Sequence, residues 1–163
     1  DMKFPKYNYF YKYGFFEYQP LLPFSSSTKG FHKLIQISQK YGFYSLMSSS
    51  KAYRDQKDNF LLPFTQEGFS ITMDIAKNPK LIAKQTKMFY EMNDLVIDLG
   101  GKIYFGKTPV MNKNQLYKMY ENFDDFLQIK EKYDPKNIFM SNMLRRILDS
   151  PSNNCELYSK YSY

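Results

Sequence analysis

The stretch FSITMDI at residues 69–75 decides the fold, because its apolar and polar side chains alternate without a break. The apolar positions are Phe69, Ile71, Met73 and Ile75, and the polar ones are Ser70, Thr72 and Asp74. A period of two is typical of a β-strand that has one face on a core and the other in water. The sequence therefore predicts an antiparallel sheet with one open face around this strand.

The chain before this strand begins with an irregular segment and a first strand. Residues 1–13 are aromatic and basic without a regular period, and they predict a lead-in loop. The stretch FFEYQPLL at 15–22 predicts a strand, with Phe16 on one face and Glu17 on the other. Because Pro20 lacks a backbone N–H, we expect this strand at an edge of the sheet, or its ladder to end there.

A helix and a second strand follow. Apolar residues, Ile35 among them, recur at helical spacing over 28–41. Residues 25–28 supply candidate N-caps, and Gly42 is placed to end the helix. The stretch FYSLMSSSK at 43–51 predicts the second strand.

The same order of elements returns after residue 75. Pro79 opens a helix that the apolar stripe extends to Leu99, and Gly100 and Gly101 end it before the strand GKIYFGK. Helices are expected at 113–132 and 137–148. Two β-α-β units in sequence predict an α+β fold of the split βαβ, ferredoxin-like kind, with both long helices on one face of an antiparallel sheet and further helices at the C-terminus.

Composition fits one globular domain over 14–148, with a polar tail at 149–163. The net charge of +7 comes from lysines spread along the chain, which favours a solvated basic surface over a nucleic-acid tract. No apolar run reaches the length of a transmembrane segment and no signal peptide is evident, so we expect a cytoplasmic protein. Its charge is compatible with a peripheral membrane contact.

Conventional catalytic constellations are absent from the sequence. His32 and Cys155 are the only histidine and cysteine, so no metal site and no Ser-His-Asp or Cys-His site is expected. The glycines match no phosphate-binding loop, and the strands do not match the aromatic signature of an RNA-binding sheet.

What remains is a set of polar residues that the predicted strands place on one sheet face. These are Gln19, Lys51, Thr72, Tyr104 and Lys107. Lysine cations and neutral hydrogen-bonding groups suit a polyhydroxylated or phosphorylated ligand, and a lysine can stabilise a reduced anionic flavin. Each residue alone is equally compatible with a solvated surface. Tyr104 and Lys107 differ in strand parity, so they share a face only if the strand ends or bulges at Gly106.

Five stretches in order resemble the C-terminal half of FAD-linked oxidases of the vanillyl-alcohol-oxidase superfamily, in the sugar-lactone oxidase branch. They are FFEYQPLLP, YGFYSLMSSSKAYR, GFSITMDI, IDLGGKIYFGK and KYDPKNIFMSNMLRRIL. The resemblance covers about residues 10–148. It implies a substrate-binding cap domain that lies over the flavin, with substrate between the ring and the sheet.

The resemblance also implies roles for the residues of that face. Lys107 and Lys51 would be catalytic, Gln19, Tyr104 and Thr72 would bind substrate, and Tyr104 and Lys107 would lie at the flavin. Thr72 occupies a position that is cysteine in one member, and Phe69 a position that is often tryptophan. These departures leave the substrate open: a sugar, a sugar lactone or a polyprenyl-phosphate sugar.

The family's flavin-binding half, which lies N-terminal to these stretches, has no counterpart among the 163 residues. FAD would be held mainly by that missing domain, so we expect the chain alone to be inactive. In this interpretation its partners are a sugar-type substrate and the N-terminal flavin-binding domain, with no nucleic acid. The alternative is a non-catalytic module that uses the open sheet face for an anionic partner such as RNA.

Overall fold

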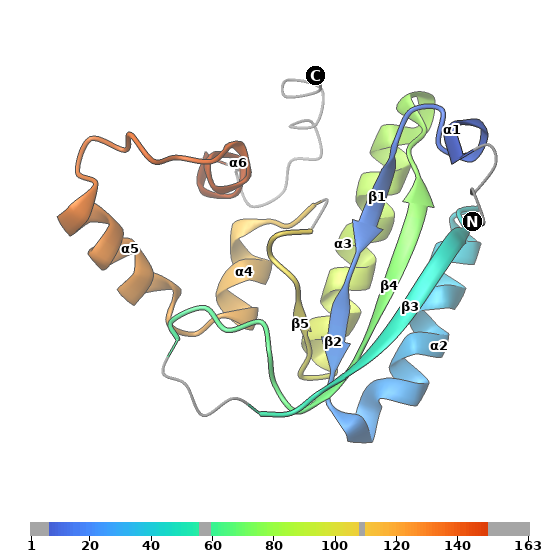
Figure 1. Ribbon diagram of the computed structural model, residues 1–163, viewed down its shortest axis with the longest axis horizontal. Coiled ribbons are helices and arrows are strands. Elements are labelled where there is room, and N and C mark those ends of the chain that lie inside the picture. Colours follow the sequence, from blue (N-terminus) through green and yellow to red (C-terminus); the bar gives the residue numbers. More distant parts are fainter. Residues whose placement is uncertain (1–6, 56–59, 108–109, 150–163) are drawn as a thin grey trace, which may run out of the picture.

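The structure is a computed structural model that describes residues 7–55, 60–107 and 110–149. The strand at its centre is β4 (Gly68–Ala76) (Figure 1). It contains the alternating stretch. On one side it pairs with β1 (Phe15–Tyr18) and β2 (Pro20–Leu22), and on the other with β3 (Ser45–Tyr53). The short strand β5 (Lys102–Ile103) pairs with the far side of β2. All four pairings are antiparallel, as predicted.

The strands β1 and β2 act as one strand that Pro20 interrupts. Tyr18 lies opposite Met73 and Leu21 opposite Ser70, so the register with β4 does not shift across the break. Of the two alternatives predicted for Pro20, the edge position is wrong, because β2 has neighbours on both sides, whereas the break between β1 and β2 agrees with an interrupted ladder. The ladder to β5 does not need a proline N–H, since the Tyr104 N–H donates to the Gln19 carbonyl at 2.9 Å.

The resulting strand order, β3-β4-β1/β2-β5, is that of a split βαβ fold, and the α+β prediction is confirmed. The helices α2 (Phe24–Lys40) and α3 (Ile82–Asp98) both pack against the same face of the sheet (Figure 1). Between that face and the helices lies the core, which includes Tyr18, Met73 and Phe89.

Both ends of α2 follow from residue types. The helix begins at Phe24, directly after Pro23, whose carbonyl accepts the N–H groups of Ser26 and Ser27. Residues 25–28 therefore lie inside the helix and are not its caps, contrary to the prediction. At the other end Gly42 adopts a φ of +77°, which residues other than glycine rarely adopt, and the helix ends as predicted.

The helix α3 follows a short 3₁₀ turn, η1 (Pro79–Leu81). The Asn78 side chain caps this turn by accepting the Lys80 N–H. Met88, Phe89, Met92 and Val96 form the buried stripe of α3. Leu81 lies in the turn before the helix and is exposed.

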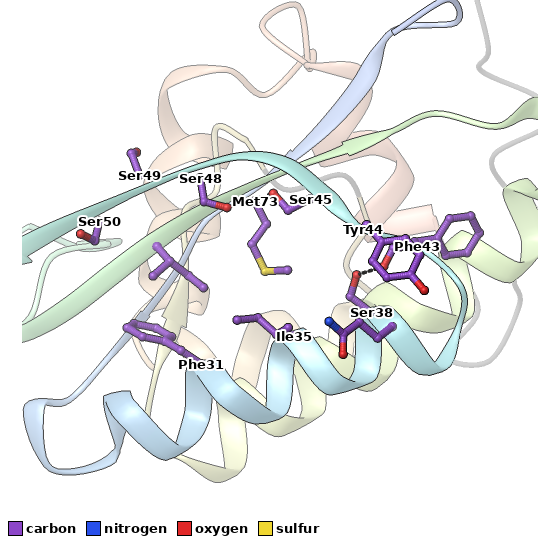
Figure 2. A pocket seen from close by; sticks show the side chains of 12 residues that line it. Phe31, Ile35, Ser38, Phe43, Tyr44, Ser45, Ser48, Ser49, Ser50 and Met73 are labelled. Atoms are coloured by element: carbon purple, nitrogen blue, oxygen red, sulfur yellow. Dashed lines mark hydrogen bonds between the residues drawn. The ribbon is translucent and has the colours of Figure 1, made fainter. Parts of the chain in front are cut away.

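The core is incomplete beneath β3. At the middle of β3 the side chains that face the helices are those of Ser48 and Ser50, which are small and leave space above α2. A groove of about 380 Å³ results, and Ile35 of α2 and Met73 of β4 point into it (Figure 2). This explains why Ile35, expected in the core, is substantially exposed.

Both terminal regions differ from expectation. The predicted lead-in loop contains one helical turn, α1 (Tyr7–Phe10). The predicted helix 113–132 is two helices, α4 (Lys113–Met119) and α5 (Phe123–Tyr133), separated at residues 120–122. Residues 1–6 of the lead-in and 150–163 of the tail, including Cys155, lie outside the described residues.

The last helix, α6 (Asn142–Asp149), begins later than predicted. The Asp134 carboxylate accepts the N–H groups of Ile138 and Phe139 at 2.7 and 3.0 Å, which holds that segment in a turn. Among the described residues, no helix is long and apolar enough to cross a membrane.

Candidate functional site

Four polar side chains form a row across the sheet face that points away from α2 and α3. Ser49 lies opposite Thr72, and the register of β1/β2 with β4 places Gln19 opposite Thr72 on its other side. The backbone bond from Tyr104 to Gln19 completes the row. We call Ser49, Thr72, Gln19 and Tyr104 the Gln19 row. Three of the five predicted site residues thus lie side by side.

The Gln19 row is more enclosed than an open sheet face. Gln19 and Thr72 are 3% and 7% exposed, against the expectation that both would lie in water. The Ser49 and Thr72 hydroxyls lie 2.7 Å apart, and the Gln19 amide lies 3.5 Å from the Tyr53 hydroxyl. These polar groups satisfy one another, as burial requires.

A strap formed by residues 62–66 covers one end of this face. Phe64 contacts the rings of Tyr53 and Tyr104, with centroids 5.7 and 5.1 Å apart. Two further bonds fasten the strap: Lys102 Nζ donates to the Pro63 carbonyl at 3.0 Å, and Gln66 donates to the Gly100 carbonyl at 2.9 Å. Burial beneath the strap lowers the pKa of the Lys102 ammonium.

The strap explains why the alternation of β4 did not predict burial correctly. Ser70, which lies on the strap side of the sheet, is fully buried, and its hydroxyl has no hydrogen-bond partner among the described residues. Phe69, predicted to face the core, is exposed and contacts Phe24 at the outer end of the sheet.

Lys107 reaches the same face through a turn. The Lys107 N–H donates to the Tyr104 carbonyl at 3.1 Å, so the strand ends at Ile103 and the chain reverses over Gly106. A Cβ at Gly106 would lie 3.2 Å from the Tyr104 ring, a close approach that glycine permits. The turn brings Lys107 Nζ into an ion pair with the Glu17 carboxylate. Tyr104 and Lys107 therefore share a face although they differ in strand parity, because the chain turns at Gly106, as the sequence predicted.

Glu17 and Asp74 belong to this site although neither was predicted as a site residue. They lie directly opposite each other on β1 and β4, one row beyond the Gln19 row. Burial raises the pKa of Asp74, the Glu17 charge raises it further, and Lys107 opposes the rise. The signal was present in the sequence, since Glu17 precedes Gln19 by two residues and therefore shares its face.

Lys51 lies on the same face but at its opposite end. It pairs with Ser70 on the edge strand β3 and is exposed. The rows of Glu17 and of Ser70 are four residues apart, about 13 Å along a strand. Lys51 and Lys107 therefore belong to rows that are well separated along the same sheet face.

The side chains on this face favour one kind of chemistry. No group of three or more His, Cys, Asp or Glu side chains able to hold a metal ion occurs in the part of the chain that the structure describes. Amide, hydroxyl and phenol groups in one row, with a carboxylate–ammonium pair beside them, are suited to several hydroxyl groups of one small ligand.

Comparison with known proteins identifies the family. The model of the D-arabinono-1,4-lactone oxidase family matches residues 7–147, and the chain belongs to this family. Decaprenylphosphoryl-beta-D-ribose oxidase of Mycolicibacterium smegmatis is 26% identical over 134 residues, which cover 82% of this chain. The chain spans only 28% of the length of that relative. The resemblance to sugar-lactone oxidases inferred from the five stretches is thereby confirmed.

Proposed function

We propose that this chain is the substrate-binding portion of an FAD-dependent oxidoreductase that oxidises a hydroxyl-bearing carbon of a sugar or sugar lactone. The observation that carries the proposal is the Gln19 row with the Glu17–Lys107 pair beside it, on the one sheet face that the long helices leave uncovered. Membership of an oxidase family supports the reaction class.

The donors on this face fit a flavin ring better than a whole flavin dinucleotide. The Tyr104 phenol and the Lys107 ammonium can donate to the carbonyl and nitrogen edge of an isoalloxazine. The glycines of the sequence form no phosphate-binding loop, so the pyrophosphate would be held by another part of a longer protein. When bound, FAD would supply the hydride acceptor.

The residues of this chain divide the remaining work. Gln19 and Thr72 would bind hydroxyl groups of the substrate, and their hydrogen bonds to Tyr53 and Ser49 hold the two side chains in place. Glu17 would accept a hydrogen bond or the proton of the reacting hydroxyl. Lys107 would stabilise the negative charge left on the substrate oxygen.

Lys51 suggests how the substrate class could be distinguished. Because it lies at the strap end of the face, it suits an anionic group remote from the reacting carbon, as a glycosyl phosphate would present. A simple lactone would not use it. Replacing Lys51 with alanine should weaken the binding of a phosphorylated substrate and leave the binding of a lactone unchanged.

The alternative of an RNA-binding face is weaker. Lys107 is paired with Glu17, and Asp74 lies beside them, so two carboxylates accompany one ammonium at that end of the face. A polyanion would be repelled there.

Binding to the chain itself tests the proposal. We would titrate D-arabinono-1,4-lactone into the isotope-labelled chain and follow backbone amide resonances. We expect the largest shifts at Thr72, Gln19 and Tyr104, with weak affinity. Shifts confined to the groove around Ile35 and Ser48, or no shift at saturating lactone, would refute the assignment of this face.

A further inference from the structure

A second surface, distinct from the Gln19 row, lies at the end of the sheet where β1 and β3 begin and β4 ends. Four segments far apart in sequence meet there: α1, the turn from α2 to β3, the end of β4, and η1 (Figure 1). We call it the sheet-end surface. Its exposed apolar and aromatic residues are Tyr9, Phe10, Tyr13, Tyr44, Leu46 and Leu81.

These side chains form one surface and are unusually exposed. Each is between 41% and 79% exposed. Tyr13, Tyr44, Leu46 and Leu81 line a single shallow groove of about 370 Å³. Tyr9 and Phe10 extend the surface along α1, with their rings edge to face. Contiguous exposed apolar groups of this kind mark interaction sites.

The segments that form the sheet-end surface are rich in lysine. Residues 7–14, 40–46 and 75–90 contain no Asp or Glu and six lysines: Lys12, Lys40, Lys77, Lys80, Lys84 and Lys87. Of these six lysines, Lys40 forms a salt bridge with Glu91 at 2.9 Å. Lys77 itself lines the groove, and Lys12 lies 5.5 Å from the centre of the Tyr13 ring. Cations and aromatic rings are therefore interleaved.

We propose that the sheet-end surface docks on an anionic lipid bilayer. Tyrosine and phenylalanine settle at the headgroup level, where the ring is apolar and the phenol remains hydrated. Lysines around them are attracted to anionic lipids. This inference is independent of the function proposed for the other face.

Two other occupants fit the composition less well. Lysine is depleted in protein–protein interfaces, whereas here it surrounds the apolar groups. A nucleic acid would engage the lysines and aromatic faces but has no use for the exposed aliphatic side chains of Leu46 and Leu81. A bilayer surface uses both sets of groups.

Vesicle co-sedimentation of the chain tests this docking. We expect the chain to bind phosphatidylcholine vesicles that contain phosphatidylglycerol, to bind pure phosphatidylcholine much less, and to lose most binding at high salt. The triple variant K77E/K80E/K84E should bind at least about 100-fold more weakly, since each lysine near an anionic surface contributes a factor of about five.

The matched control is K113E/K118E/K132E, which makes the same charge change on exposed lysines of α4 and α5 at the other side of the molecule. Its binding should stay much closer to that of the wild type. A second variant, F10S/Y44S, retains all charges and should also lose binding. Equal losses for the two triple variants, equal binding to neutral vesicles, or preferential binding of RNA over vesicles would overturn the proposal.

Discussion

Lys107 forms an ion pair with Glu17 although 90 residues separate them in the sequence. The pairing of β2 with β5 and the turn over Gly106 bring them together on the same sheet face. About a third of each side chain remains exposed, so the pair is accessible to a ligand. Any role of Lys107 in charge stabilisation therefore belongs to the pair.

Replacing Lys107 with alanine separates a chemical role from a structural one. In a longer protein that includes the flavin-binding half, Lys107→Ala should lower turnover by roughly 30- to 1000-fold, equivalent to about 2–4 kcal/mol of transition-state stabilisation. The thermal midpoint should change little, because a partly exposed ion pair contributes little to folding. Steady-state kinetics and calorimetry measure the two effects, with Lys113→Ala as control. Near-normal turnover with a lower midpoint would make Lys107 structural.

The isolated chain should be colourless when purified. The sheet face offers donors for the flavin ring, but the sequence offers no cradle for the pyrophosphate, which supplies much of the affinity for a dinucleotide. Absorbance spectroscopy after gel filtration in the presence of FAD measures this. A flavin band that stays with the protein peak would show that the cofactor is held by these residues.

Asp74 makes the free energy of unfolding of the chain depend on pH. Because its folded-state pKa is raised, mainly by burial, the folded protein binds more protons than the unfolded chain between the two pKa values. This contribution is favourable below the unfolded pKa of about 3.9 and is lost as pH rises through the folded pKa. Asp74→Asn should therefore stabilise the chain at pH 7 and give no advantage at acidic pH.

Thermal unfolding at the two pH values measures the difference between wild type and variant. Glu67→Gln, an exposed carboxylate in the segment before β4, serves as the control and should shift the midpoint little at either pH. An Asp74→Asn variant that is less stable than wild type at pH 7 would contradict the assignment.

Asn93 connects the sheet to α4 through buried hydrogen bonds. It accepts from the Tyr18 hydroxyl at 3.2 Å and donates to the Val110 carbonyl and to Gln115 at 2.9 and 3.0 Å. Burial raises the pKa of Tyr18 well above its usual value, so its hydroxyl stays protonated as a donor. Asn93→Leu should cost about 2–5 kcal/mol, because several buried partners lose their bonds.

Urea denaturation of the purified chain measures this cost. Asn114→Ala, at an exposed position of α4, should cost far less and controls for the loss of an asparagine. A cost below about 1 kcal/mol for Asn93→Leu would mean that water replaces the amide.

The sequence predicted the elements that local physics determines. Alternation in FSITMDI marked β4, Gly42 and Gly100 ended the long helices at positive φ, and repetition of β-α-β implied the strand order. The expected edge at Pro20 was wrong because a carbonyl of Gln19, rather than an N–H of Pro20, makes the bond to β5.

Non-local packing accounts for what sequence reasoning missed. Alternation described Ser70 and Thr72 as solvent-facing, but the strap that buries this end of the face is contributed by residues 62–66, whose path no local pattern specifies. Glu17 was placed on the right face and yet overlooked, since its importance arises only from contact with Lys107 and Asp74. The distance between Lys51 and Lys107 likewise depends on which rows of the sheet they occupy.

We propose that this sheet face presents a sugar hydroxyl to a flavin. The most direct measurement is anaerobic stopped-flow mixing of a longer protein, in which this chain follows its flavin-binding half, with D-arabinono-1,4-lactone or a phosphorylated ribose derivative. We expect the flavin absorption band to bleach with at least one of these substrates, and the bleaching to slow when the hydrogen on the reacting carbon is replaced by deuterium. A flavin that stays oxidised with every hydroxyl-bearing sugar would contradict it.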